Sequence, residues 1–254
     1  MKKLIIANWK MNPGIEKDAR RLLNALRARS SLFKKIELVI CPPFVYVPLA
    51  VERARRIPAL VGVQNISDAD MGLHTGEISA SMARSVGATH VILGHSERRA
   101  MGETDELIRE KIIRALAGRL TPVVALGETE RTEDAHHVLG QQLKKILFQL
   151  PREKVGRIIF AYEPRWAISG GVHDTRGSAD TPESALEKMI YIRRLLANRY
   201  GAALASRARI LYGGSVRAHN VRLFLAGNPS FNGAHVGGAS VDQKAFTGLV
   251  EALC

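Results

Sequence analysis

The sequence predicts an α/β protein, a single (β/α)8 barrel domain formed by residues 1–254. Short runs rich in Val and Ile alternate with longer amphipathic stretches along the whole chain, which is typical of parallel strands joined by helices. The pattern repeats eight times, the number of β–α units that closes a barrel. A length of 254 residues is common for one such barrel, and polar residues gather where the apolar runs end.

The predicted strands are the short apolar runs. They are Leu4–Trp9, Ile36–Cys41, Ala59–Asn65, His90–Gly94, Pro122–Gly127, Arg157–Glu163, Arg209–Gly213 and Phe231–Gly237. Because a helical stretch follows each run, and a crossover between parallel strands needs such a connection, we expect all of these strands to be parallel.

The predicted helices carry apolar residues at spacings of three and four, as in Leu186, Met189 and Ile190. They are Ile15–Ala28, Tyr46–Arg56, Ile78–Val86, Asp105–Ala117, Ala135–Leu150, Pro182–Asn198, Val216–Leu225 and Asp242–Leu253. The alternative is a doubly wound open sheet. However, the first β–α turn lacks the Gly-rich fingerprint of dinucleotide-binding sheets.

The composition favours one enclosed core. The chain is 46% apolar, and no linker, low-complexity tract or shift in composition divides it. The formal net charge of +13 permits nucleic acid, an anionic membrane or an anionic substrate as partner, but the basic residues are spread along helices, usually near Glu or Asp. Cys41 and Cys254 lie far apart without metal-ligand spacing, so neither a disulfide framework nor a zinc site is predicted.

The N-terminal segment has the look of a short signal peptide. Its apolar run ends too soon, at Asn8, and no segment is long enough to span a bilayer. We therefore expect a protein of the reducing cytoplasm that has no membrane partner.

Polar residues follow most of the predicted strands. They are Asn8 and Lys10 after the first strand, Gln64 and Asn65 after the third, His95 after the fourth, Glu128 after the fifth, Glu163 at the end of the sixth, Ser215 after the seventh and Gly237-Gly238 after the eighth. The carboxyl ends of barrel strands converge on one rim, where the active sites of this fold lie. The pattern therefore predicts a site at that rim.

Glu163 is the most informative of these residues. It follows the apolar run Ile158–Ala161 and precedes a Pro/Trp corner and the small residues Ser169-Gly170-Gly171. Burying a carboxylate is costly unless something pairs with it or uses it. The segment predicts a base beneath a movable lid, and a solvated or ion-paired Glu at a strand end is the alternative.

Short motifs along the chain resemble the triosephosphate isomerase family. They are Asn8-Trp9-Lys10-Met11-Asn12, Thr75–Ser79, Gly94–Arg99, Gly127-Glu128-Thr129, Tyr162-Glu163-Pro164, Trp166-Ala167-Ile168, Tyr212–Val216 and Val236–Ser240. Each motif is weak alone, but their order and their places at strand ends make the set specific. The resemblance covers nearly the whole chain and implies the (β/α)8 TIM barrel.

The resemblance also implies a reaction. Members of the family interconvert D-glyceraldehyde 3-phosphate and dihydroxyacetone phosphate through an enediolate, in glycolysis and gluconeogenesis, without a metal or an organic cofactor. Glu163 would be the base, its pKa lifted towards 7 by an apolar, closed site. His95 would polarise the carbonyl as a neutral imidazole, because a helix N-terminus follows it and disfavours the charged ring.

Lys10 and Asn8 would complete the catalytic set implied by the resemblance. Lys10 would supply fixed positive charge, and Asn8 would donate a hydrogen bond. Glu97 resembles the carboxylate that holds this lysine, although a neighbouring Arg is an alternative partner for it. For His95 and Lys10 themselves, a structural strand-end histidine and a surface lysine are the alternatives.

The phosphate group of the substrate would be held by backbone donors of Gly-rich turns. The expected contacts are Gly214 and Ser215 after the seventh strand, Gly237 and Gly238 after the eighth, and Ser169 and Gly170 in the lid. Ser169 stands where the family has a Gly. The lid, residues 167–180, is also longer than the family's usual lid by about half a dozen residues, which is typical of functional or mobile loops.

His235 is the second departure from the family pattern. The family has a Leu there, which forms an apolar clamp with Ile168 over the catalytic Glu. A charged imidazole beside Glu163 would favour the carboxylate and make it a weaker base. Alternatively, His235 would line a larger or more polar substrate pocket.

Residues 67–79 resemble the loop that docks into a neighbouring subunit of the family, close to Lys10 and Met11. This implies a homodimer, with Thr75 in the docking loop. His74 replaces a usual aromatic residue in the loop, so we expect a weaker dimer that loosens when His74 is protonated.

Two other functions remain possible on this evidence. An isomerase of another small sugar phosphate, such as a tetrulose phosphate, would explain His235 and the long lid. A basic barrel that has lost catalysis and binds RNA or another polyanion would explain the charge of +13. The chain shows no nucleic-acid-binding motif, which disfavours that second alternative.

Overall fold

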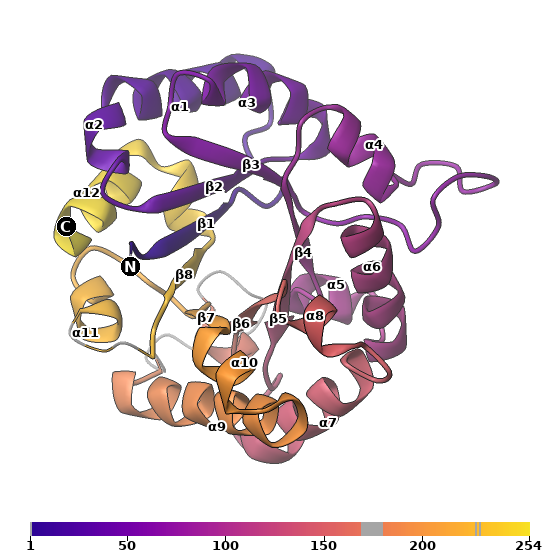
Figure 1. Ribbon diagram of the computed structural model, residues 1–254. Coiled ribbons are helices and arrows are strands. Elements are labelled where there is room, and N and C mark those ends of the chain that lie inside the picture. Colours follow the sequence, from indigo (N-terminus) through magenta and orange to yellow (C-terminus); the bar gives the residue numbers. More distant parts are fainter. Residues whose placement is uncertain (1, 169–179, 227, 229) are drawn as a thin grey trace.

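Figure 1 shows a ring of helices around a central barrel of strands. The structure is a computed structural model, which describes residues 2–168, 180–226, 228 and 230–254. The strands β1 to β8 are hydrogen-bonded in sequence order, and β8 pairs with β1, so the sheet closes into a barrel. All of the pairings are parallel, which confirms the predicted fold class.

The strands lie where the apolar runs predict them, with ends that differ by one or two residues in most cases. They are β1 (Leu4–Asn8), β2 (Glu37–Cys41), β3 (Ala59–Val63), β4 (His90–Leu93), β5 (Thr121–Leu126), β6 (Ile159–Tyr162), β7 (Arg209–Tyr212) and β8 (Gly233–Val236). The polar residues that end several of the predicted strands therefore lie just beyond the hydrogen-bonded barrel.

The helices cover the outside of the barrel. They are α1 (Glu16–Ala28), α2 (Ser30–Phe33), α3 (Val47–Ala54), α4 (Ala80–Ser85), α5 (Ser96–Ala100), α6 (Asp105–Ala117), α7 (Ala135–Ile146), α8 (Arg152–Val155), α9 (Pro182–Tyr200), α10 (Ala202–Arg207), α11 (Val221–Leu225) and α12 (Gln243–Leu253). The described part of the chain also contains three short 3-10 helices, η1 (Phe44–Tyr46), η2 (Arg165–Ala167) and η3 (Gly238–Val241). The short helices α2, α8 and α10 were not predicted, because each has too few residues to show a helical period.

The apolar residues form an inner and an outer core. Successive side chains of a strand point to opposite faces, so Leu4 and Ile6 of β1 belong to a small cluster inside the barrel. Ile5 and Ala7 of the same strand belong to the larger cluster between barrel and helices. Because both faces of the strands are buried, a charged side chain is tolerated only where a strand ends.

One predicted helix begins later than expected. The sequence predicts a helix from Val216, but α11 starts at Val221. The side chain of Asn220 accepts a hydrogen bond from the N–H of Arg217 and donates one to the carbonyl of Ser215. These bonds give the backbone an alternative to the helix, as Asn side chains often do. The segment after β7 is therefore a turn that faces the rim.

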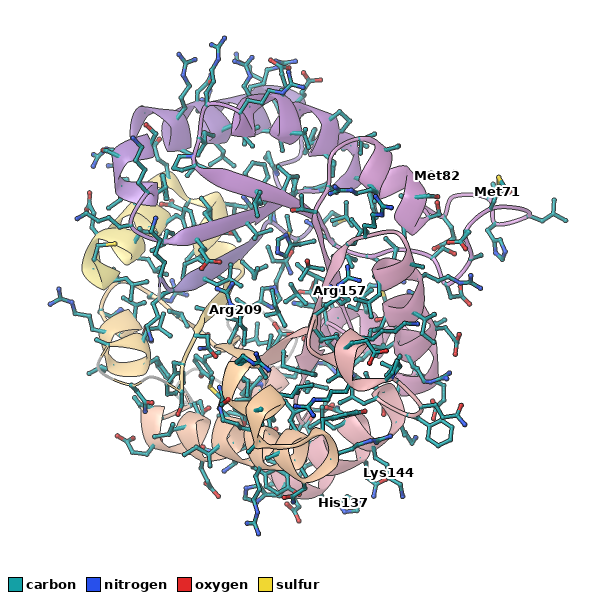
Figure 2. All side chains as sticks on the ribbon, viewed as in Figure 1. Met71, Met82, His137, Lys144, Arg157 and Arg209 are labelled. Carbon is teal, nitrogen blue, oxygen red and sulfur yellow. The ribbon has the colours of Figure 1, made fainter. Side chains whose placement is uncertain are left out.

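The chain between β3 and α4 projects away from the barrel, as Figure 1 shows. Met71 and Leu73 lie on this segment and are 86% and 103% exposed, and Met71 is labelled there in Figure 2. Among the described residues, no helix is both long enough and apolar enough to cross a membrane.

Candidate active site

A cavity of about 500 Å³ lies at the carboxyl ends of the strands. It brings together most of the site residues predicted from the sequence. Its lining includes Asn8, Lys10, His95, Glu163, Ile168, Gly214, Ser215, His235, Gly237 and Gly238. Ser169 and Gly170 lie outside the described residues. Segments far apart in the sequence therefore meet at one rim, as the strand-end pattern predicts.

Glu163 directly follows β6, and its side chain is 4% exposed. Its N–H donates to the carbonyl of Leu126 at 2.7 Å, which fixes the backbone beside β5. A Cβ on Gly213 would lie 3.1 Å from the Cβ of Glu163, and one on Gly127 would lie 2.3 Å from its carbonyl oxygen. Glycine on both neighbouring strand ends therefore lets the chain pack closely around this carboxylate.

Burial raises the pKa of Glu163 to about 8. The charge of Lys10 and a hydrogen bond from the N–H of Ser96, 3.4 Å from Oε2, oppose this shift without cancelling it. A carboxyl group of this kind gains and loses a proton near neutral pH. That is the property expected of a general base at this position.

His95 is the residue before α5, and its side chain is 6% exposed. Its Nδ1 accepts a hydrogen bond from the N–H of Glu97 at 3.2 Å. Burial, and then the charge of Lys10, lower the pKa of His95 to about 3, so the ring is neutral near pH 7. Burial rather than the helix N-terminus is thus the main cause of the neutral state. Because Nδ1 is an acceptor, the proton is on Nε2, which lies 3.4 Å from Oε1 of Glu163.

Lys10 is held in an uncommon backbone conformation, with a φ of 53°. The side chain of Asn8 accepts a hydrogen bond from the N–H of Lys10 at 3.0 Å, and Gln64 donates to its carbonyl at 2.8 Å. These bonds stabilise the conformation and direct the lysine into the cavity. Strained residues of this kind cluster at functional sites.

Glu97 is the ion-pair partner of Lys10, with 2.7 Å between its Oε1 and Nζ. The neighbouring arginines have other partners. Arg99 pairs with Asp105 at 2.7 Å, and Arg98 lies 4.0 Å from Glu103. The structure therefore answers the question that the sequence left open about this carboxylate.

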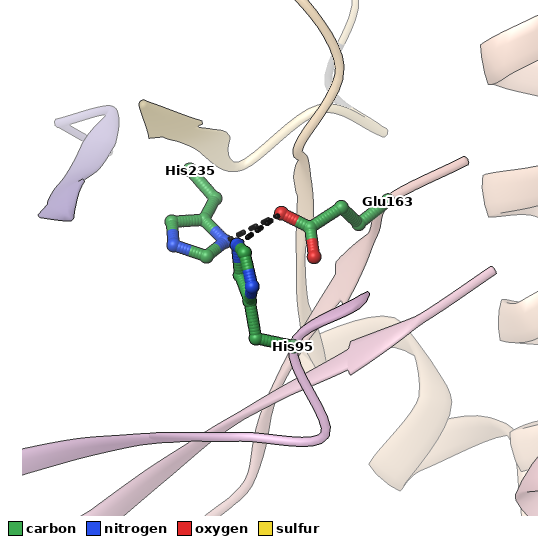
Figure 3. Close-up of side chains that lie close together, drawn as sticks. All are labelled: His95, Glu163 and His235. Carbon is green, nitrogen blue, oxygen red and sulfur yellow. Dashed lines mark ion pairs between the residues drawn. The ribbon is translucent and has the colours of Figure 1, made fainter. Parts of the chain in front are cut away.

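His235 lies on β8, and its Nδ1 is 3.4 Å from Oε1 of Glu163. Figure 3 shows both imidazoles directed at the same carboxylate oxygen. Complete burial, and then the neighbouring His95 and Lys10, lower the pKa of His235 well below its usual value. This shift favours the neutral ring, because burial disfavours the charged form, so the effect described above for a charged imidazole is not expected.

Of the residues expected to bind phosphate, Gly214, Ser215, Gly237 and Gly238 border the same cavity, from the chain after β7 and after β8. Both the N–H and the hydroxyl of Ser215 donate to the carbonyl of Ala167, at 3.0 and 2.7 Å. Ser215 thus connects the turn after β7 to η2. An anion that binds this N–H would have to replace Ala167 as the acceptor.

Glu128 has a role that the sequence analysis did not assign. It accepts hydrogen bonds from the hydroxyl of Tyr162 at 3.0 Å and from Nε1 of Trp166 at 2.9 Å. The guanidinium of Arg131 lies over the Trp166 ring, 5.1 Å from its centroid. These contacts anchor the chain that leaves β6. The polar tip of Trp166 was the available signal, because a buried indole N–H needs an acceptor.

The model of the family described as triosephosphate isomerase matches residues 3–253. The chain belongs to the triosephosphate isomerase family. Triosephosphate isomerase of Bacteroides fragilis is 35% identical over 256 residues, which cover 99% of each chain. That of Rhodopirellula baltica is 38% identical, covering 98% of this chain and 96% of its own.

A solved structure agrees with the family assignment. The crystal structure of triosephosphate isomerase from Bartonella henselae has a TM-score of 0.84 and 33% sequence identity. It covers 100% of this chain, and this chain covers 99% of it. The resemblance found in the short motifs is therefore confirmed over the full length of the triosephosphate isomerase fold.

Proposed function

We propose that this protein interconverts D-glyceraldehyde 3-phosphate and dihydroxyacetone phosphate. Membership of the triosephosphate isomerase family supports this reaction. The observation that carries the proposal is the pairing of a buried Glu163, with a pKa of about 8, and a neutral His95 only 3.4 Å away. Since the two substrates are glycolytic intermediates, the expected compartment is the cytoplasm.

In the proposed mechanism, Glu163 removes the proton from the carbon beside the substrate carbonyl. The electron pair moves into the C–C bond, and an enediolate forms. His95 donates from Nε2–H to the carbonyl oxygen and moves protons between the two oxygens. Glu163 then returns its proton to the neighbouring carbon. Carbon is oxidised at one position and reduced at the next, so the isomerisation is balanced without an added redox cofactor.

Lys10 stabilises the negative charge that develops on the enediolate and on the phosphate. Its ammonium group lies close enough to lower the pKa values of both His95 and Glu163. Glu97 holds it by a 2.7 Å ion pair, and Asn8 borders the same cavity. Charges fixed in advance stabilise a transition state without reorganisation during the reaction.

The phosphate group is proposed to lie at Gly214, Ser215, Gly237 and Gly238, which border the same cavity as the base. Backbone N–H groups in such turns bind anions. Ser169 and Gly170 are proposed to add contacts from the lid, which would exclude water from the enediolate.

A homodimer is proposed for the active form. Met71 and Leu73, on the projecting segment, and Met11, beside the catalytic lysine, are 86%, 103% and 92% exposed in the single chain. Large apolar side chains exposed to this extent are typical of protein interfaces. Thr75 and His74 belong to the same segment and would lie at that interface.

The alternatives are not favoured by the comparisons. The relatives from Bacteroides fragilis and Rhodopirellula baltica are both named triosephosphate isomerase, and they match nearly the whole chain. A tetrulose phosphate isomerase or a catalytically inactive polyanion-binding barrel would need an observation that separates this chain from them.

The test is steady-state isomerisation of D-glyceraldehyde 3-phosphate by the wild type and by Glu163→Gln. Gln has the shape of Glu but cannot accept a proton, so kcat is expected to fall by about 100-fold to 10,000-fold. Glu153→Gln, a substitution on the exposed surface of α8, is the matched control and should leave turnover unchanged. Absence of turnover in the folded wild type, or full turnover in Glu163→Gln, would contradict the proposal.

A further inference from the structure

Two imidazoles and one carboxylate converge at the base of the cavity, as Figure 3 shows. Nε2 of His95 and Nδ1 of His235 each lie 3.4 Å from Oε1 of Glu163. One ligand atom from each side chain lies within 4.8 Å of the others, and all three residues are buried. They come from β8 and from the chain just after β4 and β6, so the barrel itself sets their spacing.

The separation of each imidazole nitrogen from the carboxylate oxygen fits a tetrahedral metal ion. Zn²⁺ binds imidazole nitrogen at about 2.0–2.1 Å and carboxylate oxygen at about 2.0–2.2 Å. Two ligands at such distances on a tetrahedron are separated by about 3.4 Å. The two distances to Glu163, each 3.4 Å, match this value. Two His with one carboxylate is also a donor set found in zinc enzymes, with the fourth position open.

His235 lacks the partner that a buried imidazole needs. Its side chain is 2% exposed, and neither ring nitrogen has a hydrogen-bond partner among the described residues. Burying an unpaired polar group costs free energy, and most such groups in proteins are paired. A metal ion that binds Nδ1 would provide a strong interaction for this ring.

His95 can serve as a ligand after a change of tautomer. Ligation through Nε2 requires the ring proton to be on Nδ1, where the N–H of Glu97 now donates. Oε2 of Glu97 lies 3.7 Å from that nitrogen and would accept the proton's hydrogen bond after a small movement. A carboxylate behind a metal-bound His is a common arrangement that orients the ring.

We propose that His95, Glu163 and His235 form a Zn²⁺-binding site, in which the bound ion occupies the base of the active-site cavity. All three residues line the cavity of about 500 Å³, so an ion reaches them by the same route as a small substrate. The positive charge of Lys10 borders the same cavity, and its ion pair with Glu97 reduces its repulsion of a cation.

Occupation of this site has a consequence for activity, which rests on the proposed function. Zn²⁺ would hold the carboxylate that must accept a proton and the Nε2 that must donate one. The ion would therefore inhibit isomerisation in competition with substrate, and removal of Zn²⁺ by EDTA would restore it. Metal binding itself does not depend on the proposed reaction.

The test is a titration of the full-length protein with Co²⁺, followed by visible absorption, because Co²⁺ substitutes for Zn²⁺ and its spectrum reports the number and type of ligands. We expect a saturable four-coordinate spectrum that Zn²⁺ displaces. His235→Leu should abolish it. His136→Leu removes a half-buried His that lies 3.3 Å from Glu187, outside the cavity, and this control should leave the spectrum unchanged.

A second variant covers the case in which His235→Leu fails to fold, as judged by circular dichroism. Glu97→Gln removes the carboxylate behind His95 and should weaken Co²⁺ binding by about 10-fold to 100-fold. The proposal is wrong if the wild type gives no four-coordinate spectrum, if folded His235→Leu keeps it, or if Glu97→Gln binds with unchanged affinity. Isomerase activity in metal-free buffer is measured separately, so loss of the metal site and loss of the proposed function are distinguishable.

Discussion

At the scale of single residues, burial decides which protonation states the site contains. His95 and His235 are neutral because burial lowers their pKa values, and Glu163 is poised near neutral pH because burial raises its pKa. Lys10 opposes the shift of the carboxyl group but does not cancel it. Burial in one cavity therefore provides a weak acid and a base from side chains whose ordinary pKa values differ by about 2 units.

This balance predicts the pH dependence of the free enzyme. The pKa of Glu163 is about 8, and only its deprotonated form is a base. The value of kcat/KM should therefore rise about tenfold per pH unit below 8 and level off above it. The protonation of His95 should not change kcat/KM between pH 5 and 9, because the pKa of His95 is about 3. Initial rates in metal-free buffer across that range measure kcat/KM at each pH. A value of kcat/KM that is constant from pH 5 to 9 would refute the prediction.

The residues of the site could be predicted because strand ends are visible in the sequence. Glu163, His95 and Lys10 each follow an apolar run, and parallel strands of a barrel bring their carboxyl ends to one rim. The neutral state of His235 could not be predicted, because it depends on burial, which in turn depends on strand register. The roles of these residues in the reaction stay predictions.

At the scale of elements, a buried ion pair positions the end of β4. Lys111 on α6 lies 2.5 Å from Oε1 of Glu103, and both side chains are almost fully buried. Oε2 of Glu103 accepts a hydrogen bond from the N–H of Gly94, the residue before His95. Lys111 also donates to Asn65 after β3 at 2.9 Å. The pair thus connects α6 with two neighbouring rim segments.

Lys111→Met is expected to destabilise the protein by about 3–5 kcal/mol, because it leaves the buried charge of Glu103 with only the distant Arg98, 4.0 Å away, as an ion-pair partner. The double variant Glu103→Gln/Lys111→Met removes both charges and should recover most of that loss. Urea unfolding followed by circular dichroism measures both differences. Equal stability of the single variant and the wild type would show that the pair does not hold β4 and α6 together.

Helix bounds could be predicted where the apolar period continues over the whole helix. They were predicted poorly where a side chain forms hydrogen bonds with backbone groups that a helix would use. α6 has the predicted bounds, Asp105–Ala117, because its apolar face repeats over the full helix. The helix expected from Val216 starts at Val221 instead, because Asn220 bonds to the backbone around it. A single side chain of this kind does not change the apolar pattern from which helices are predicted.

At the scale of the whole molecule, the barrel is closed, but large apolar side chains are exposed on its surface. The segment between β3 and α4 carries exposed Met71, and Met82 on α4 is 51% exposed close to it (Figure 2). When a second chain covers exposed apolar side chains such as these, their removal from water stabilises the complex. The proposed homodimer would do so.

Leu73→Glu tests the dimer, because it would bury a charge at the proposed interface. Sedimentation of the wild type should give twice the chain mass of 27.9 kDa, and Leu73→Glu should sediment as a single chain. Ile190→Glu, at a position 50% exposed on α9, is the matched control and should remain dimeric. The proposal fails if the wild type is monomeric at micromolar concentration or if Leu73→Glu remains a dimer.

The central claim is that Glu163 transfers a proton through an enediolate, and isomerisation in D₂O tests it most directly. A proton held on the carboxyl group can exchange with solvent before it returns to carbon. We therefore expect ¹H NMR to detect deuterium on the product carbon that receives this proton, and Glu163→Gln to lose turnover and deuterium incorporation together. Unchanged turnover and unchanged deuterium incorporation in folded Glu163→Gln would contradict the account.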